Sequence, residues 1–183
     1  YRRENLFLVS KVYPHNAGRA RIYRSLEGSL KRLGTDYLDL YLLHWRGSVP
    51  LGETVECMEE LVRSGKIRHW GVSNFDTSDM EELFQEESGV NCAVNQVLYH
   101  LGSRGIEYDL MPWLGERGIP VMAYCPLAQA GALRKEIMEN QVLRETASRY
   151  SITVMQLLLA FVMQQEGVAA IPRSGSREHV LEN

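Results

Sequence analysis

The chain has 183 residues, of which 45% are hydrophobic and 23% charged, the composition of an ordinary globular protein with a substantial core. A net charge of -3, without one long basic block, argues against binding to nucleic acid or to an anionic membrane. The longest apolar stretch, residues 157–163, is too short to span a membrane, and the first residues do not resemble a signal peptide. The three cysteines, Cys57, Cys92 and Cys125, are odd in number and far apart. They indicate a reducing compartment, the cytoplasm, and offer no zinc-binding spacing.

Hydrophobic patterning predicts six strands, each followed by a helix. The central strand lies in DYLDLYLLHW at residues 36–45, where positions 37–43 are apolar or aromatic except for Asp39. This pattern is typical of a parallel strand that is buried on both faces. The predicted strands are 6–12, 37–43, 67–72, 92–98, 119–124 and 168–171. The predicted helices are 19–33, 53–62, a short one capped by 76–78, 106–117 in parts, 142–150, 155–165 and one that starts at 174–176.

Strict β/α alternation implies a parallel α/β sheet with right-handed crossovers. An open doubly wound sheet and a closed barrel both satisfy it, but no G-x-G-x-x-G follows a strand, which disfavours the open dinucleotide-binding sheet. A (β/α)8 TIM barrel needs eight units and about 250 residues. We therefore expect residues 1–183 to form a single domain, part of a larger barrel, with about six units present, two units missing and the C-terminus truncated.

Polar or reactive side chains stand at the end of each predicted strand. In a barrel the carboxyl ends of the strands share one mouth, where the active site lies. Taken singly, each such side chain is more often a solvated or structural group, but their convergence favours a site. The strand-end residues are Lys11, His44, Ser73, Asn74, Gln96, Tyr124, Arg173 and Ser174.

The turn at residues 171–177, IPRSGSR, has the composition of an anion site. It joins a strand to a helix start and combines free N–H groups with two arginines and two serines. The alternative is a serine-capped helix with solvated arginines. Tyr124, which directly precedes Cys125-Pro126-Leu127, offers a flat ring on which a planar ligand could stack. The alternative is a tyrosine of the core. No residue near Cys125 in the sequence would make it a thiolate, so we predict no cysteine nucleophile.

Six motifs in order resemble the aldo-keto reductase family: LVSKV, DYLDLYLLHW, GKIRHWGVSNF, VNQVLYH, VMAYCPLA and IPRSGSREHVLEN. They run from Leu8 to Asn183 and are most similar to bacterial members that reduce methylglyoxal and related dicarbonyls. The resemblance implies a (β/α)8 barrel that binds NADPH across its mouth and transfers hydride to an aldehyde or ketone. It also implies a monomer whose partner is a small carbonyl substrate, with no metal.

The resemblance assigns roles residue by residue. Lys11 and His44 match the catalytic lysine and histidine, and Trp45 matches an aromatic residue of the substrate pocket. Arg173 replaces the family's usual lysine, and His179 stands where many members have an arginine. The expected cofactor-binding residues are Ser73, Asn74 and Gln96 at the nicotinamide carboxamide, Tyr124 stacked on its ring, Cys125 and Leu127 along the groove, and Arg173, Ser174, Ser176, Glu182 and Asn183 at the adenosine end.

The family's catalytic aspartate and tyrosine belong to a D-x-A-x-x-Y pattern that this sequence does not contain. We expect that pattern before Tyr1, and we therefore expect the chain alone to be inactive. Two alternatives to the reductase stay open at this point. One is a family member that binds NADPH in a regulatory, non-catalytic role. The other is an unrelated phosphate-ligand barrel, an isomerase or aldolase, in which Lys11 forms a Schiff base.

Overall fold

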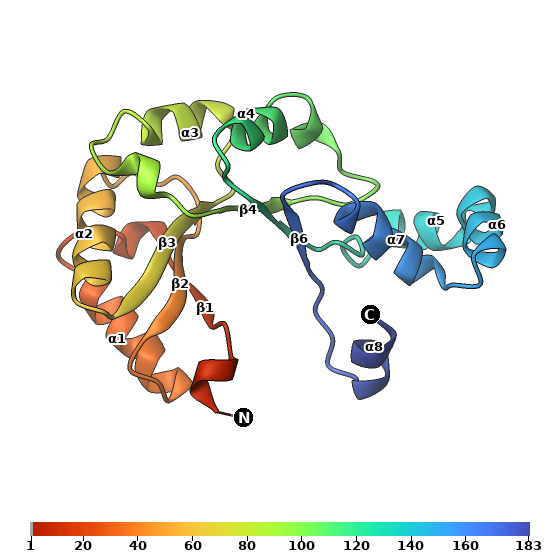
Figure 1. The fold of residues 1–183 in the computed structure, drawn as a ribbon, viewed down its shortest axis with the longest axis horizontal. Helices are drawn as coiled ribbons and strands as arrows, with labels where there is room; N and C mark the ends of the chain where they lie inside the picture. The colour runs from red at the N-terminus through yellow and green to blue at the C-terminus, as the bar shows by residue number, and fades with distance from the viewer. Residues whose placement is uncertain (1) are drawn as a thin grey trace. The chain divides into compact units, whose positions relative to one another are not determined.

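The computed structural model describes residues 2–183, which fall into two compact units, one up to Gln96 and the other from Val97 to Asn183 (Figure 1). The strands follow one another in chain order, β1 to β6, in one sheet, and the pairs β1–β2, β2–β3, β3–β4 and β5–β6 are parallel. This topology confirms the predicted α/β alternation and is consistent with part of a (β/α)8 barrel. The single domain, the missing units and the truncation stay predictions.

The first unit alternates strands and helices close to the predicted positions. Its elements are β1 (Val9–Val12), α1 (Ile22–Leu33), β2 (Leu38–Leu43), α2 (Leu51–Arg63), β3 (Ile67–Ser73) and α3 (Thr77–Leu83), with the 3-10 helices η1 (Arg3–Asn5), η2 (Pro14–Asn16) and η3 (Gly89–Asn91). β4 (Asn95–Leu98) begins in this unit and ends in the next.

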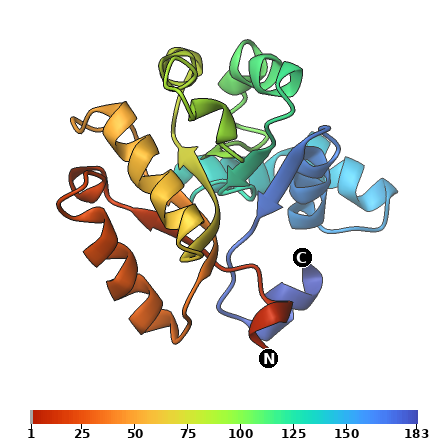
Figure 2. The same cartoon turned by 60° about the vertical axis from the view of Figure 1, so that its left-hand side comes forward.

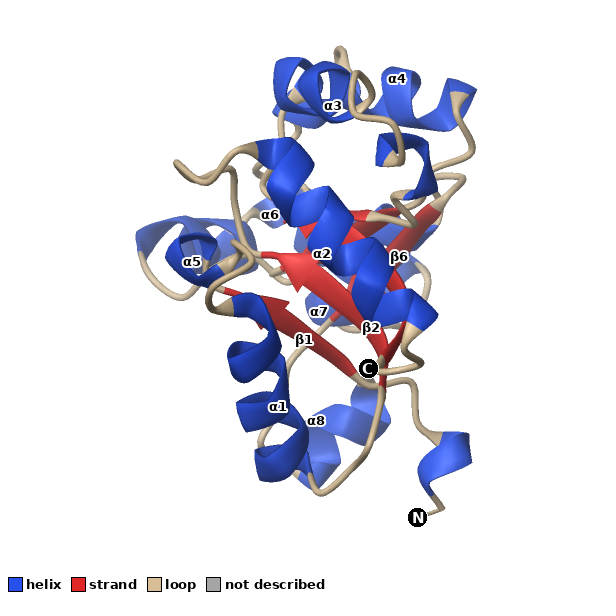
Figure 3. Ribbon diagram, turned by 90° about the vertical axis from the view of Figure 1, so that its left-hand side faces the viewer, coloured by secondary structure: helices blue, strands red, loops and turns tan. Residues whose placement is uncertain are grey.

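β2 is the centre of the first unit. All six of its residues are buried, which confirms the prediction of a strand covered on both faces. α1 packs against β1 and α2 against β3, and the two helices cover the same face of the strands (Figures 2 and 3). α1 ends where Gly34 adopts a left-handed φ of 66°, as its position after Leu33 predicts.

The described part of the second unit contains fewer strands and more α-helices than the first. Its elements are η4 (Gly105–Glu107), α4 (Leu110–Glu116), β5 (Val121–Tyr124), α5 (Ala132–Glu139), α6 (Gln141–Arg149), α7 (Val154–Met163), β6 (Val168–Ile171) and α8 (Arg177–Glu182). The predicted capping box is confirmed, because Thr153 and Gln156 cap each other at the start of α7. No single helix within residues 2–183 is long and apolar enough to cross a membrane, although α6 and α7, bent by 85°, meet that test as a pair.

The sequence analysis missed α5 and began some strands too early. α5 buries only Ile137, so its apolar periodicity is weak. β1 begins at Val9 and β4 at Asn95, whereas residues 6 and 92 were expected. Extended apolar residues look alike in sequence whether or not a neighbouring strand pairs with them, so the pattern alone overestimates strand length.

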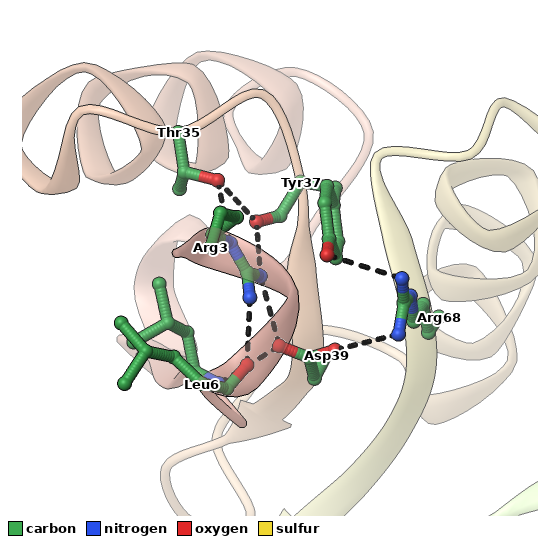
Figure 4. A network of polar contacts seen from close by, with 7 residues as sticks. Arg3, Leu6, Thr35, Tyr37, Asp39 and Arg68 are labelled. Carbon is green, nitrogen blue, oxygen red and sulfur yellow. Dashed lines mark hydrogen bonds and ion pairs between the residues drawn. The ribbon is translucent and has the colours of Figure 1, made fainter. Parts of the chain in front are cut away.

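Asp39 is a charged residue within the buried strand β2, and the groups that bind its carboxylate explain why it can be buried there (Figure 4). Asp39, whose side chain is 2% exposed, accepts from the Arg3 guanidinium and from the Leu8 backbone N–H, both at 2.8 Å. Arg68 lies 3.1 Å from its other oxygen, and the guanidinium groups of Arg3 and Arg68 both contact the Tyr37 ring. A buried carboxylate is thereby surrounded by charge partners.

Candidate functional site

Lys11 lies on β1, and His44 directly follows the neighbouring strand β2 at the same edge of the sheet. Lys11 is in register with Leu42, and the backbone N–H of His44 donates to the Val12 carbonyl at 3.0 Å. Burial lowers the pKa of Lys11. Burial and then the positive charge of Lys11 lower the pKa of His44. Both shifts favour the uncharged form, so the His44 imidazole is neutral at neutral pH.

An aromatic cluster surrounds the His44 ring. The ring centroid of His44 lies 4.7 Å from that of Trp45, and Tyr13 lies 4.5 Å from Trp45 and 6.1 Å from His44. His15 extends the cluster, with its ring 4.7 Å from Tyr13 in an edge-on arrangement. Such a wall presents an apolar surface with polar tips to a small ligand.

The sequence analysis missed Tyr13 and His15, although a signal was present. Tyr13 is two residues beyond Lys11, and side chains two apart in an extended segment point to the same side. The Lys-x-Tyr spacing at the end of a strand could therefore have predicted Tyr13. His15 follows in η2, where no such alternation applies.

Three predicted residues, Ser73, Asn74 and Gln96, form a hydrogen-bonded group where β3 ends beside β4. The Ser73 hydroxyl donates to the Gln96 carbonyl at 2.8 Å, and the Asn74 backbone N–H donates to the same oxygen at 2.9 Å. The Asn74 amide donates to the His44 carbonyl at 3.0 Å and to the Ser73 hydroxyl at 3.1 Å. Asn74 has a left-handed φ of 58°, a conformation that asparagine adopts more readily than most residues. This group therefore ties the backbone of His44 to the ends of β3 and β4.

In the second unit a groove of about 440 Å³ gathers most of the other predicted residues. Its size is that of a small-molecule site. The predicted residues that line it are Cys125, Leu127, Arg173, Ser174, Glu182 and Asn183, and His179 lines it as well. Gln129, Arg134 and Met155 also line it and were not predicted, because the turn and the helix that carry the first two gave no clear pattern.

Tyr124 and Ser176 are not among the residues that line this groove. Tyr124 ends β5, half-buried, and burial raises its pKa. The Ser176 N–H donates to the Ser174 hydroxyl at 3.1 Å, so one of the N–H groups expected to be free is already used. The turn after β5 holds Cys125 and Ala128 at φ values of 52° and 61°, which allows the chain to reverse tightly.

The two groups of residues belong to different units, and their roles in binding and catalysis stay predictions. Lys11, His44, Trp45, Ser73, Asn74 and Gln96 belong to the first unit, and the groove belongs to the second. Within residues 2–183, no three His, Cys, Asp or Glu side chains gather in a group that suits a metal ion.

Comparisons of the sequence and of the structure with known proteins agree on one family. The family model described as "Aldo/keto reductase family" matches residues 1–183. The chain is 58% identical to methylglyoxal reductase YeaE of Escherichia coli K12, covering 99% of the chain and 64% of that relative. It is 36% identical to glyoxal reductase of Bacillus subtilis, covering 99% of the chain and 62% of the relative.

Solved structures agree. An aldo/keto reductase from Klebsiella pneumoniae, in complex with NADP and acetate, superposes with a TM-score of 0.97 at 59% identity. The match covers 99% of this chain and 64% of that one. The chain thus spans less than two thirds of the length of these relatives.

Proposed function

This chain belongs to the aldo/keto reductase family, and we propose from that premise that the protein reduces small dicarbonyl compounds such as methylglyoxal with NADPH. The substrate class is suggested by the relatives named methylglyoxal and glyoxal reductase, and the cofactor by the Klebsiella structure with NADP. The observation that supports the proposal is the placement of Lys11 on β1 and of His44 just after the neighbouring strand β2, where the His44 N–H donates to the Val12 carbonyl at 3.0 Å.

The residues of the second unit suit the anionic end of a dinucleotide. Arg134 and Arg173 line the groove, and neither forms an ion pair with a carboxylate in the described part of the chain. In our proposal Arg173, Ser174, Ser176, Glu182 and Asn183 hold the adenosine end of NADPH. Cys125 and Leu127 line its path, and Tyr124 stacks on the nicotinamide. NADPH, when bound, supplies the hydride.

The first unit would position the carbonyl. His44, neutral near pH 7, donates an N–H to the substrate oxygen, orients it and stabilises the negative charge that develops there. The Lys11 ammonium stabilises the phenolate of the family's proton-donating tyrosine, whose ordinary pKa near 10 is too high for an efficient acid at neutrality. Trp45 and Tyr13 form the apolar wall of the pocket, and Ser73, Asn74 and Gln96 hold the carboxamide.

The test is NADPH consumption with methylglyoxal, followed by nicotinamide absorbance in the protein expressed from its complete gene. We expect turnover that Lys11→Met and His44→Gln each reduce by about a hundredfold or more. Lys135→Met, an exposed change on α5, is the matched control and keeps full activity. The chain 1–183 alone should show negligible turnover. Full activity of His44→Gln with every dicarbonyl tried would overturn the assigned role.

A regulatory, non-catalytic family member is the second candidate. NADPH binding without turnover of any aldehyde or ketone by the complete gene product would favour it. The unrelated isomerase or aldolase is no longer supported, because the whole chain matches the reductase family. The monomeric state and the cytoplasmic location stay predictions.

A further inference from the structure

Arg134 is a half-buried cation that forms no ion pair within residues 2–183. It is the third residue of α5 and lies on the wall of the groove in the second unit. Its one recorded polar contact is Nη2 to the Met155 sulfur at 3.9 Å, and a thioether is among the weakest hydrogen-bond acceptors in proteins. Five N–H donors on a permanent charge are thereby left without an anion.

Lys135, the next residue on α5, is by contrast an exposed cation that has a carboxylate partner. Lys135 is 75% exposed and lies 4.0 Å from the Glu139 carboxylate, one helical turn away. Arg134 instead turns toward the groove, although partial burial of a cation is unfavourable unless a counter-charge accompanies it. Glu182 lines the same groove, but within residues 2–183 no carboxylate forms an ion pair with Arg134, so its charge is available to a ligand anion.

The position of Arg134 selects which end of the groove that anion occupies. Its guanidinium touches Met155 at the start of α7, and the neighbouring Gln156 donates its side-chain amide to the Glu182 carbonyl at 3.0 Å. Arg134 thus lines the same groove as Arg173 and Ser174, the residues that the proposed function assigns to the adenosine end. Cys125 and Leu127 belong to the β5 turn that lines the same groove.

We propose that Arg134 is a further cofactor-specificity residue, whose guanidinium binds the 2′-phosphate of NADPH from the α5 wall of the groove. This inference rests on the proposed use of NADPH and names one residue that selects it over NADH. Arg134 and Arg173 together then supply two guanidinium groups, each able to bind phosphate in a bidentate manner. Position 179, a histidine here, needs no permanent charge in this arrangement.

The experiment measures binding without turnover. Calorimetric titration of the complete gene product with 2′,5′-ADP and with 5′-AMP isolates the contribution of the 2′-phosphate. We expect Arg134→Met to weaken the binding of 2′,5′-ADP by about tenfold or more, the usual effect of losing a charged hydrogen bond. The affinity for 5′-AMP should stay unchanged. Arg134→Lys retains a point charge and should recover part of the loss. Lys135→Met is the control and should change neither titration.

The outcomes separate this inference from the proposed function. If the unaltered protein prefers 2′,5′-ADP and Arg134→Met keeps that preference, the assignment of Arg134 is wrong and the use of NADPH stands. If Arg134→Met weakens both ligands equally, Arg134 packs the groove or stacks on the adenine, and the inference is again overturned. If the unaltered protein shows no preference, the proposed use of NADPH fails as well. Circular dichroism on each variant confirms that it is folded.

Discussion

Replacement of Asp39 by alanine should be among the most destabilising single changes in the first unit. The Asp39 side chain is 2% exposed and accepts from Arg3 and from the Leu8 N–H at 2.8 Å each, with Arg68 at 3.1 Å (Figure 4). Burial alone would raise the pKa of Asp39, but the Leu8 hydrogen bond and the two arginines outweigh it, and the net pKa is lowered. The ionised carboxylate therefore stabilises the fold.

The magnitude follows from burial. Breaking one partner of a buried ion pair costs about 3–5 kcal/mol, because it leaves a charge and an N–H group without partners. Asp39→Asn keeps the shape and one acceptor for the Leu8 N–H, so we expect a smaller loss of about 2–3 kcal/mol. Arg68 is 56% exposed, and Arg68→Ala should lower the free energy of unfolding by about 1 kcal/mol or less.

Urea denaturation of the complete gene product, followed by circular dichroism, measures the three variants. The contribution of Asp39 is present above its ordinary pKa of 3.8 and is lost as the pH falls through the lowered folded value. The difference between Asp39→Ala and the unaltered protein should therefore shrink in acid. An Asp39→Ala loss no larger than that of Arg68→Ala at pH 7 would refute the reasoning.

Three further predictions concern other parts of the chain. His100 is 2% exposed and burial lowers its pKa below the ordinary 6.5, so the unfolded chain binds a proton that the folded chain does not. The free energy of unfolding should fall as the pH drops below about 6.5, and His100→Gln should flatten this slope. Lys11→Met should raise the free energy of unfolding by up to about 1 kcal/mol, since it removes a desolvated ammonium. Gly89→Ala should lower the free energy of unfolding by about 2 kcal/mol or more, because the added Cβ would lie 1.8 Å from the Leu83 carbonyl oxygen. At Gly105 the added Cβ meets open space, so Gly105→Ala should change the free energy of unfolding little.

For each of these three predictions, one experimental result would contradict it. A His100→Gln variant with the same pH slope as the unaltered protein would show that another group titrates. A loss of stability in Lys11→Met would mean that the ammonium has a favourable partner in the complete protein. Equal denaturation midpoints for Gly89→Ala and Gly105→Ala would contradict the close approach of the backbone at Gly89.

Local sequence alone determined the alternation of strands and helices and several of their ends. The apolar run at residues 37–43, Gly34 after α1 and the Thr153–Gln156 capping box all act within a few residues of the chain. Patterns of this range can be read without knowing the fold. The strand-end position of Lys11 and His44 followed as well, because a parallel sheet aligns the carboxyl ends of its strands.

Only the tertiary structure decided what these residues meet. The register of β1 against β2 places Lys11 beside Leu42 and lets the His44 N–H donate to the Val12 carbonyl, and no local pattern encodes it. Asp39 is an exception to the apolar pattern in sequence and becomes intelligible only through Arg3 and Arg68, which lie some thirty residues away on either side (Figure 4). Arg134 lies on a helix with one buried residue and so has no sequence signature at all. Charge partners and ligand grooves are made by contacts between distant segments, and such contacts exist only after the chain has folded.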